Sequence, residues 1–354
     1  MRAMILAAGY GTRLWPLTAD RAKPAIPFMN RPLVGYVAEY LARYDCREVI
    51  VNLHHEAESV RRALGDGSRF GVRLSYVEEP LILGTSGALD NARDFFDDQT
   101  FVLINGKIAT NIDLAAALDT HRHTGALATL VLLPNPKRER YSTVEVSEGL
   151  VRGFGGYPVN SSASDSAGSV LHAASVLHTS SKMAGAEPDN SLEPDVPLMF
   201  TGIQILEPRI FSYIPRGVFS HSTTDVYPLA IMLGERIAAH VAGGMWYELS
   251  TIQRYLETSL TLLRQEERDV EMGEGSVVEE GAQVSAAVLW ENVRVERGAH
   301  VRRAVLGAGV RVPGGEMIEN AAVVRAELVE GTKRPDKALA GERRGANFVV
   351  PLPQ

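Results

Sequence analysis

A cluster of small and cationic residues near the start of the chain has the types and spacing needed to bind phosphate. Gly9, Gly11 and Thr12 follow a short apolar stretch, and Arg13 comes next. Glycine tolerates positive φ, so the backbone N–H groups here can converge on one anion. Arg13 offers a planar fork to phosphate oxygens, and Lys23 adds a compact charge. This suits a nucleoside triphosphate, with Arg13 on the leaving pyrophosphate and Lys23 beside the α-phosphate.

The Gly-x-Gly pattern alone also fits a tight turn in any α/β protein. A dinucleotide-binding loop needs a third glycine at a set offset, and a Walker A loop ends in Gly-Lys-Ser/Thr. The loop at residues 9–14 has neither feature. The pattern therefore indicates an anion site without defining the ligand.

Alternating strand-like and helix-like segments surround this loop and would position it. Runs typical of strands cover residues 3–6, 48–53, 72–77, 101–104 and 126–133. Segments with helical spacing cover residues 33–44, 57–64 and 114–124. The alternation predicts an α/β fold with a Rossmann-like, mostly parallel mixed sheet and helices on both faces. Ligands of such folds bind at the carboxyl ends of the strands.

The sequence pattern changes after about residue 273. Valines recur in steps of six, and Gly-Ala pairs recur between them. The paired valines are Val278 and Val284, then Val295 and Val301. This period predicts a short left-handed β-helix over residues 273–331. An irregular β-rich segment is the alternative.

These segments predict two domains, of which the first covers residues 1–262. Residues 159–197 are small and polar, and we expect an inserted, mobile loop there. Residues 332–354 are charged and contain proline, and we expect a loosely held tail.

The composition of the chain excludes several classes of partner and metal site. The net charge is -7 with a pI near 5.8, so we expect no nucleic-acid or membrane partner. The single cysteine, Cys46, allows neither a disulfide framework nor a cysteine-rich zinc site. The first apolar stretch is too short for a signal peptide or a membrane span, and we expect a cytoplasmic protein.

The extended loop sequence is more specific than its glycines. Gly-x-Gly-Thr-Arg-Leu-x-Pro-Leu-Thr, followed by Lys23-Pro24, resembles the loop of the sugar-1-phosphate nucleotidyltransferases, or NDP-sugar pyrophosphorylases. These enzymes join a sugar 1-phosphate to an NTP and release pyrophosphate. A β-helix after the catalytic domain is similar to members such as the mannose-1-phosphate guanylyltransferases, where it often mediates oligomers. The resemblance implies the same reaction and a homo-oligomer.

Further segments carry the resemblance along the chain. Residues 83–89 resemble the family's base-recognition segment, residues 200–203 its sugar-pocket strand, and residues 245–251 its Tyr-Trp-x-Asp-Ile-Gly-Thr motif. The resemblance implies that the nucleotide is bound by Ala7, Gly9, Gly11, Thr12, Gly84, Thr85 and Gly87. It implies that the sugar pocket contains Asn105, Gly202, Asp225 and Tyr157.

The chain departs from the family pattern at three places. Lys107 stands where the family has an aspartate that ligates Mg²⁺, and an ammonium cannot ligate a metal. Glu248 replaces the second metal aspartate and is a weaker candidate ligand. Gly156 and Tyr157 stand where the family commonly has Glu-Lys, whose lysine contacts the sugar phosphate.

These departures leave two functions open. In the first, the chain is an active nucleotidyltransferase, and Lys107 places its own charge where the metal stood. In the second, it is a weak or inactive paralogue that binds nucleotide or NDP-sugar and regulates an active homologue, with which it forms a complex.

Two other polar pairs lie near strand ends. Glu78 and Glu79 can reach a sugar or ribose hydroxyl, but an acidic pair near a loop is more often solvated. His54 and His55 lack an evident third metal ligand, so we interpret them as polar loop residues.

Overall fold

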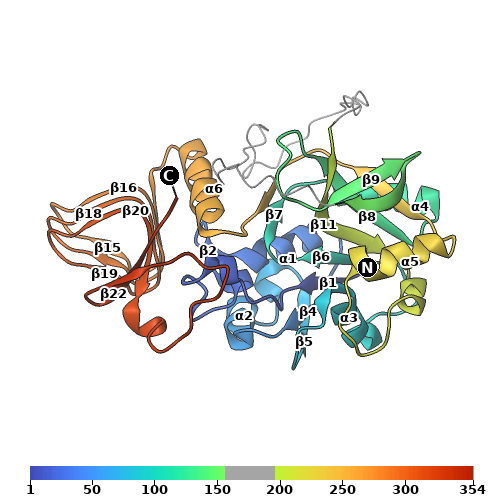
Figure 1. Ribbon diagram of the computed structural model, residues 1–354, viewed down its shortest axis with the longest axis horizontal. Coiled ribbons are helices and arrows are strands. Elements are labelled where there is room, and N and C mark those ends of the chain that lie inside the picture. Colours follow the sequence, from blue (N-terminus) through green and yellow to red (C-terminus); the bar gives the residue numbers. More distant parts are fainter. Residues whose placement is uncertain (156–195, 354) are drawn as a thin grey trace.

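The computed structural model describes residues 1–155 and 196–353. The expected inserted loop at 159–197 therefore lies almost entirely outside the described residues. Figure 1 shows two parts side by side: a sheet covered by helices, and a stack of short strands that follows helix α6 (Ile252–Gln265). Among the described residues, no helix is long and apolar enough to cross a membrane.

The first part is built on a nine-stranded sheet. Its strands, in spatial order, are β5 (Arg73–Glu78), β4 (Glu48–Leu53), β1 (Arg2–Leu6), β6 (Phe101–Asn105), β11 (Leu198–Leu206), β8 (Ala128–Pro134), β12 (Ile237–Val241), β10 (Leu150–Gly155) and β9 (Thr143–Ser147). The four strands from β5 to β6 are parallel. Strand β11 runs antiparallel between β6 and β8. The mixed α/β sheet of the sequence prediction is confirmed.

Helices cover both faces of the sheet because its buried strands are apolar on both sides. Ala3 and Ile5 face a core shared with α1 (Leu33–Arg43), α2 (Ala57–Leu64) and α4 (Leu114–Thr124). Met4 faces the opposite core, shared with α3 (Gly84–Asn91) and α5 (Tyr227–Met232). Both faces are therefore closed, and ligands reach the sheet at its edge.

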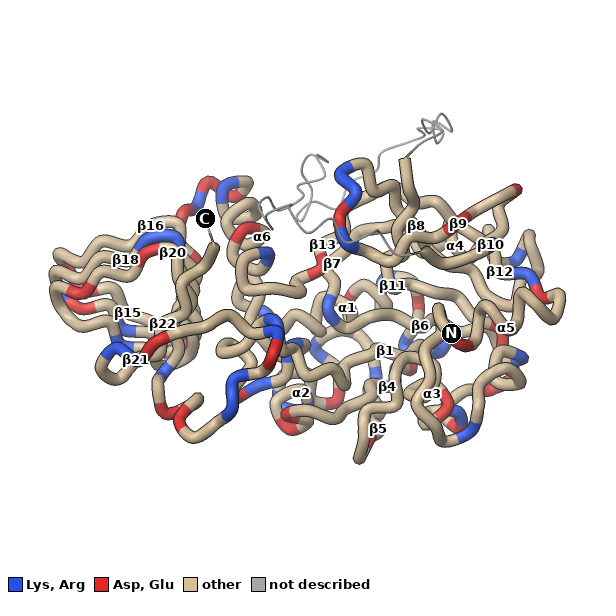
Figure 2. Tube along the Cα trace, viewed as in Figure 1, with Lys and Arg blue, Asp and Glu red and all other residues tan. Residues whose placement is uncertain are grey.

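The second part is a left-handed β-helix. Its stacked strands pair in parallel with a step of 17 residues, so Val278 lies beside Val295 and Val295 beside Val312. The strands are β14 (Val270–Met272), β15 (Val277–Val278), β16 (Gln283–Leu289), β17 (Arg294–Val295), β18 (His300–Leu306), β19 (Arg311–Val312) and β20 (Met317–Arg325). The valines fill the interior, and Arg302 pairs with Glu319 on the exterior. Figure 2 shows basic and acidic residues distributed along the coils of this stack.

The expectation of a loosely held tail over residues 332–354 is wrong. Glu342–Arg344 and Asn347–Pro351 form the hairpin β21–β22, and β22 pairs antiparallel with β20. Val349 and Val350 are buried against the last coil. An open coil presents unpaired backbone groups and an apolar interior, and this hairpin covers both.

The two parts share one apolar core. Trp290 of the β-helix is buried, and its indole N–H donates to the hydroxyl of Tyr255 on α6 at 2.9 Å. Leu14 and Leu17, which follow the glycine loop, lie in the same core. The β-helix therefore supports the segment that carries Arg13.

Candidate active site

The glycine loop follows the carboxyl end of β1 (Arg2–Leu6). Gly11 has φ +64°, and a Cβ there would lie 3.0 Å from Cβ of Lys23, so this position requires glycine. The Ala7 N–H donates to Oδ1 of Asn52 at 2.7 Å, which anchors the start of the loop to β4. Thr12 begins a short 3₁₀ turn, Thr12–Leu14.

A pocket of about 340 Å³ is lined in part by this loop. Ten of the residues expected in the site line it: Ala7, Gly9, Gly11, Thr12, Arg13, Lys23, Gly84, Thr85, Asn105 and Lys107. Segments far apart in the sequence thus meet at one edge of the sheet. Three of these residues are cationic, and one carboxylate of the described residues, that of Glu79, lines the pocket with them.

Lys23 is the buried cation of this pocket. Its exposed fraction is 9%, and its ammonium makes no hydrogen bond or ion pair with the described residues. Burial and the neighbouring charge of Lys107 hold the pKa of Lys23 well below its ordinary value, although Glu248 opposes this shift. A buried amine without a paired carboxylate is strongly stabilised by an incoming anion.

Lys107 forms an ion pair with Glu248, and this contact joins two strands. Strand β7 (Ile108–Thr110) follows Lys107 and pairs antiparallel with β13 (Trp246–Glu248). The side chain of Glu248 is 9% exposed and that of Lys107 is 37% exposed. Burial alone raises the pKa of Glu248, but Lys107 and then Lys23 lower it to about 2. Glu248 is therefore ionised at neutral pH, with Lys107 as its counterion.

Two further polar residues of the pocket were missed or misread from the sequence. Glu79 is 2% exposed, so the interpretation of a solvated acidic pair is wrong for it. It accepts from Nδ2 of Asn52 at 2.6 Å and from the Leu83 N–H at 2.9 Å. Asn52 and Glu79 lie at the carboxyl ends of adjacent parallel strands, and this placement was the available signal.

The expected base-recognition segment, residues 83–89, forms most of helix α3. Gly84 has φ +78°, and a Cβ there would overlap the backbone of Ser220. A Cβ on Gly87 would lie 2.5 Å from the carbonyl oxygen of Val218. Gly84 and Thr85 line the pocket, whereas Gly87 lies outside the lining and allows this close packing. His221, from the packed segment, was not expected and lines the pocket.

Of the residues expected in the sugar pocket, one lines the pocket and two support it from behind or beside it. Asn105 lines the pocket, and Gly202 packs directly behind it, where any Cβ would overlap the Asn105 amide. Asp225 accepts from the His221 N–H at 2.6 Å and lies outside the lining, so it positions that segment. Tyr157 lies outside the described residues.

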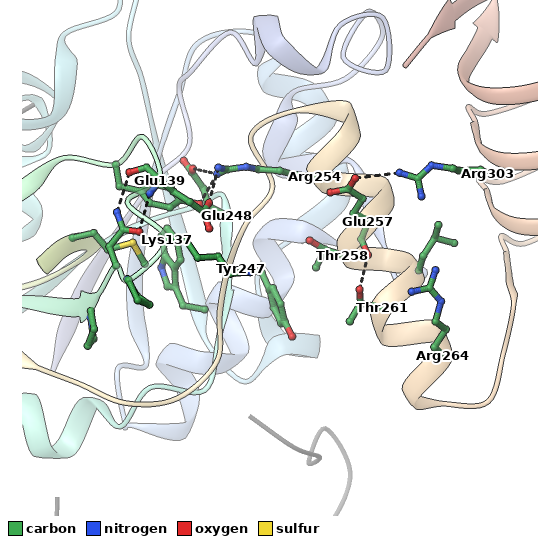
Figure 3. Close-up of a pocket in the computed structure, with 17 residues that line it drawn as sticks. Lys137, Glu139, Tyr247, Glu248, Arg254, Glu257, Thr258, Thr261, Arg264 and Arg303 are labelled. Carbon is green, nitrogen blue, oxygen red and sulfur yellow. Dashed lines mark hydrogen bonds and ion pairs between the residues drawn. The ribbon is translucent and has the colours of Figure 1, made fainter. Parts of the chain in front are cut away.

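A second pocket, of about 200 Å³, lies on the far side of Glu248 between the α/β part and the β-helix (Figure 3). Arg254 of α6 donates to Glu139 at 2.8 Å and approaches Oε2 of Glu248 at 3.8 Å. Arg303 of the β-helix bonds Glu257 of α6 at 3.1 Å. Glu248 therefore lies between Lys107 in one pocket and Arg254 in the other.

A resident divalent cation does not fit these residues. In the part of the chain that the structure describes, no group of three or more His, Cys, Asp or Glu side chains could hold a metal ion. The one carboxylate at the expected place, Glu248, already faces Lys107 and Arg254. A divalent ion there would meet strong repulsion from these cations. The expected metal ligation by Glu248 is thus not supported by its surroundings.

The fold and the pocket define an α/β protein with a cation-lined pocket at the edge of its sheet and a β-helix after it. The nucleotidyl transferase family matches residues 2–265, and a GlmU-like C-terminal hexapeptide family matches residues 268–326. The chain belongs to the nucleotidyl transferase family, which confirms the resemblance.

Several named proteins are similar to this chain. A UTP–glucose-1-phosphate uridylyltransferase from Synechocystis is 29% identical over 83% of this chain and 71% of its own length. An N-acetylmuramate α-1-phosphate uridylyltransferase from Neisseria meningitidis is 30% identical over 73% of this chain and 96% of its own length. The crystal structure of a putative glucose-1-phosphate thymidylyltransferase from Bacillus anthracis has a TM-score of 0.58 at 21% identity, covering 75% of this chain and 95% of that chain. The last similarity supports the fold.

Proposed function

We propose that this protein joins a sugar 1-phosphate to a nucleoside triphosphate and releases an NDP-sugar and pyrophosphate. One observation carries the proposal: Arg13, Lys23 and Lys107 line one pocket with the backbone of the glycine loop. The family and the names of its members favour a transferase over a purely regulatory binding protein. Those names differ in both base and sugar, so the proposal specifies the reaction class.

In the proposed reaction, an oxygen of the sugar 1-phosphate attacks the α-phosphorus of the NTP. A new P–O bond forms, the bond between the α-phosphorus and its bridging oxygen to the β-phosphorus breaks, and pyrophosphate leaves. Arg13, which is exposed at the pocket mouth, binds the leaving phosphates. Lys23 is buried and fixed, and it stabilises the charge that develops near the α-phosphate.

The other end of the nucleotide would lie against the first turn of α3. Gly84 and Thr85 line the pocket, and the Thr85 hydroxyl is held by the N–H of Ser222. Glu79 and Asn52 hold each other, and the second Nδ2–H of Asn52 and the further lone pairs of the Glu79 carboxylate can orient a ribose hydroxyl. We further propose that the β-helix mediates a homo-oligomer, which size-exclusion chromatography with light scattering would test.

The reaction is tested by measuring pyrophosphate release from pairs of common NTPs and sugar 1-phosphates, with and without divalent cations. We expect one or a few pairs to react, and Arg13→Ala to slow them. Lys333→Met is the matched control, because Lys333 is exposed and its side chain makes no hydrogen bond or ion pair with the described residues. Failure of every pair to release pyrophosphate above background would contradict the proposal.

A further inference from the structure

Lys107 is held at a fixed place beside the phosphate loop. Gly106, which precedes it, donates its N–H to the Leu6 carbonyl at 2.9 Å, and a Cβ there would lie 2.9 Å from Cγ2 of Ile5. The turn after β6 is therefore pressed against the end of β1. Glu248 holds the ammonium from the other side. The position of this cation is set by backbone contacts as well as by its counterion.

The ammonium remains able to bind a ligand. A lysine ammonium has three donors, and the Glu248 contact uses one. The side chain of Lys107 is 37% exposed and lines the same pocket as Arg13 and Lys23. Glu248 is nearly buried and absent from that lining, so the pocket presents the cation rather than the carboxylate.

The local charge is also balanced without a metal. A divalent ion on two carboxylates has zero net charge, and so does the Lys107–Glu248 pair. The pair differs in being permanently present, since neither partner must be supplied from solution. A carboxylate already neutralised by an ammonium has little remaining attraction for Mg²⁺ or Mn²⁺.

We propose that Lys107 is the resident cation of this phosphate pocket, so that the protein binds the triphosphate of an NTP without a divalent ion held by its carboxylates. The inference rests on the proposed function and specifies how the same site neutralises phosphate. Lys107 donates to the phosphate oxygens with its free N–H groups while Glu248 keeps it in place.

Two measurements on the full chain test this. In the first, Mn²⁺ is titrated into nucleotide-free protein and the free ion is followed by electron paramagnetic resonance. We expect no bound Mn²⁺ for the wild type and one bound ion for the double variant Lys107→Asp with Glu248→Asp. Stoichiometric Mn²⁺ binding by the wild type, lost in Glu248→Gln, would overturn the inference.

In the second, UTP, GTP, dTTP, CTP and ATP are titrated calorimetrically in EDTA and in excess Mg²⁺. For the NTP that binds, we expect wild-type affinities within about threefold of each other in the two buffers. Lys107→Met should weaken binding in EDTA by about tenfold or more, which is the loss of one charge-assisted hydrogen bond. Lys107→Arg should keep most of the affinity, and Lys333→Met all of it.

The outcomes separate this inference from the proposed function. Wild-type binding in Mg²⁺ that disappears in EDTA would contradict the inference and leave the proposed function standing. If no NTP binds in either buffer, the proposed function fails, and the Mn²⁺ titration still decides whether the carboxylates hold a metal. Circular dichroism of each variant verifies that it is folded.

Discussion

Replacing Lys107 with methionine should destabilise the protein by removing the counterion of a buried carboxylate. The pKa of Glu248 is lowered from 4.5 to about 2 by its cationic neighbours against the effect of burial. A shift of this size corresponds to about 3 kcal/mol of net stabilisation of the ionised form. Among the cationic neighbours, Lys107 lowers the pKa of Glu248 most. Its side chain is 37% exposed, and solvent screening therefore reduces its contribution to the free energy of unfolding to about 1–2 kcal/mol.

The sign of the pH dependence follows from the direction of the shift. The folded-state pKa of Glu248 is lowered, so its contribution is fully present above pH 4.5 and is lost as the pH falls toward 2. Urea unfolding followed by tryptophan fluorescence at pH 7 should therefore show the full loss for Lys107→Met. At pH 4 the difference from the wild type should be smaller.

A double-mutant cycle with Glu248→Gln isolates the pair, and a coupling free energy of about 1–2 kcal/mol is expected. Lys333→Met, which removes an exposed lysine, should change the free energy of unfolding by less than about 0.5 kcal/mol. A Lys107→Met protein as stable as the wild type at pH 7, with zero coupling, would refute the reasoning.

Three further changes have defined outcomes. Gly202→Ala should lower the free energy of unfolding by about 1–3 kcal/mol more than Gly234→Ala does. Both glycines have φ near +85° to +89°, but only the methyl at position 202 would overlap a neighbour, the Asn105 amide. Equal thermal shifts of the two variants would contradict this. Arg13→Ala should raise the NTP dissociation constant about tenfold or more in calorimetry, and unchanged affinity would exclude Arg13 from the site. Burial lowers the pKa of His121, so stability should fall as the pH drops below 6.5, and His121→Gln should flatten the urea-measured slope between pH 7 and 5.5; an unchanged slope would count against this.

Local patterns predicted the local elements well. The expected helices at 57–64 and 114–124 have the same bounds as α2 and α4. Asp113 caps α4 through the N–H groups of Ala115 and Ala116, and Gly125 ends it with φ +55°. Helix caps such as these depend on residues next to the helix ends, and they can therefore be recognised from the sequence alone.

Contacts between distant segments were not predictable in this way. The Lys107–Glu248 pair joins residues 141 apart, and each side chain alone resembled a defective metal ligand. The burial of Glu79 depends on the pairing of β4 with β5, which no local pattern specifies. The terminal hairpin was missed because its charged and proline residues hid the short apolar strand that covers the last coil.

The fate of each phosphate of the NTP tests the central claim most directly. The reacting NTP is supplied once with label in the α-phosphate and once in the γ-phosphate, together with its sugar 1-phosphate. The account predicts that α-label appears in the NDP-sugar and γ-label in pyrophosphate, in equal amounts. Label found only in free nucleotide and inorganic phosphate, without an NDP-sugar, would contradict it.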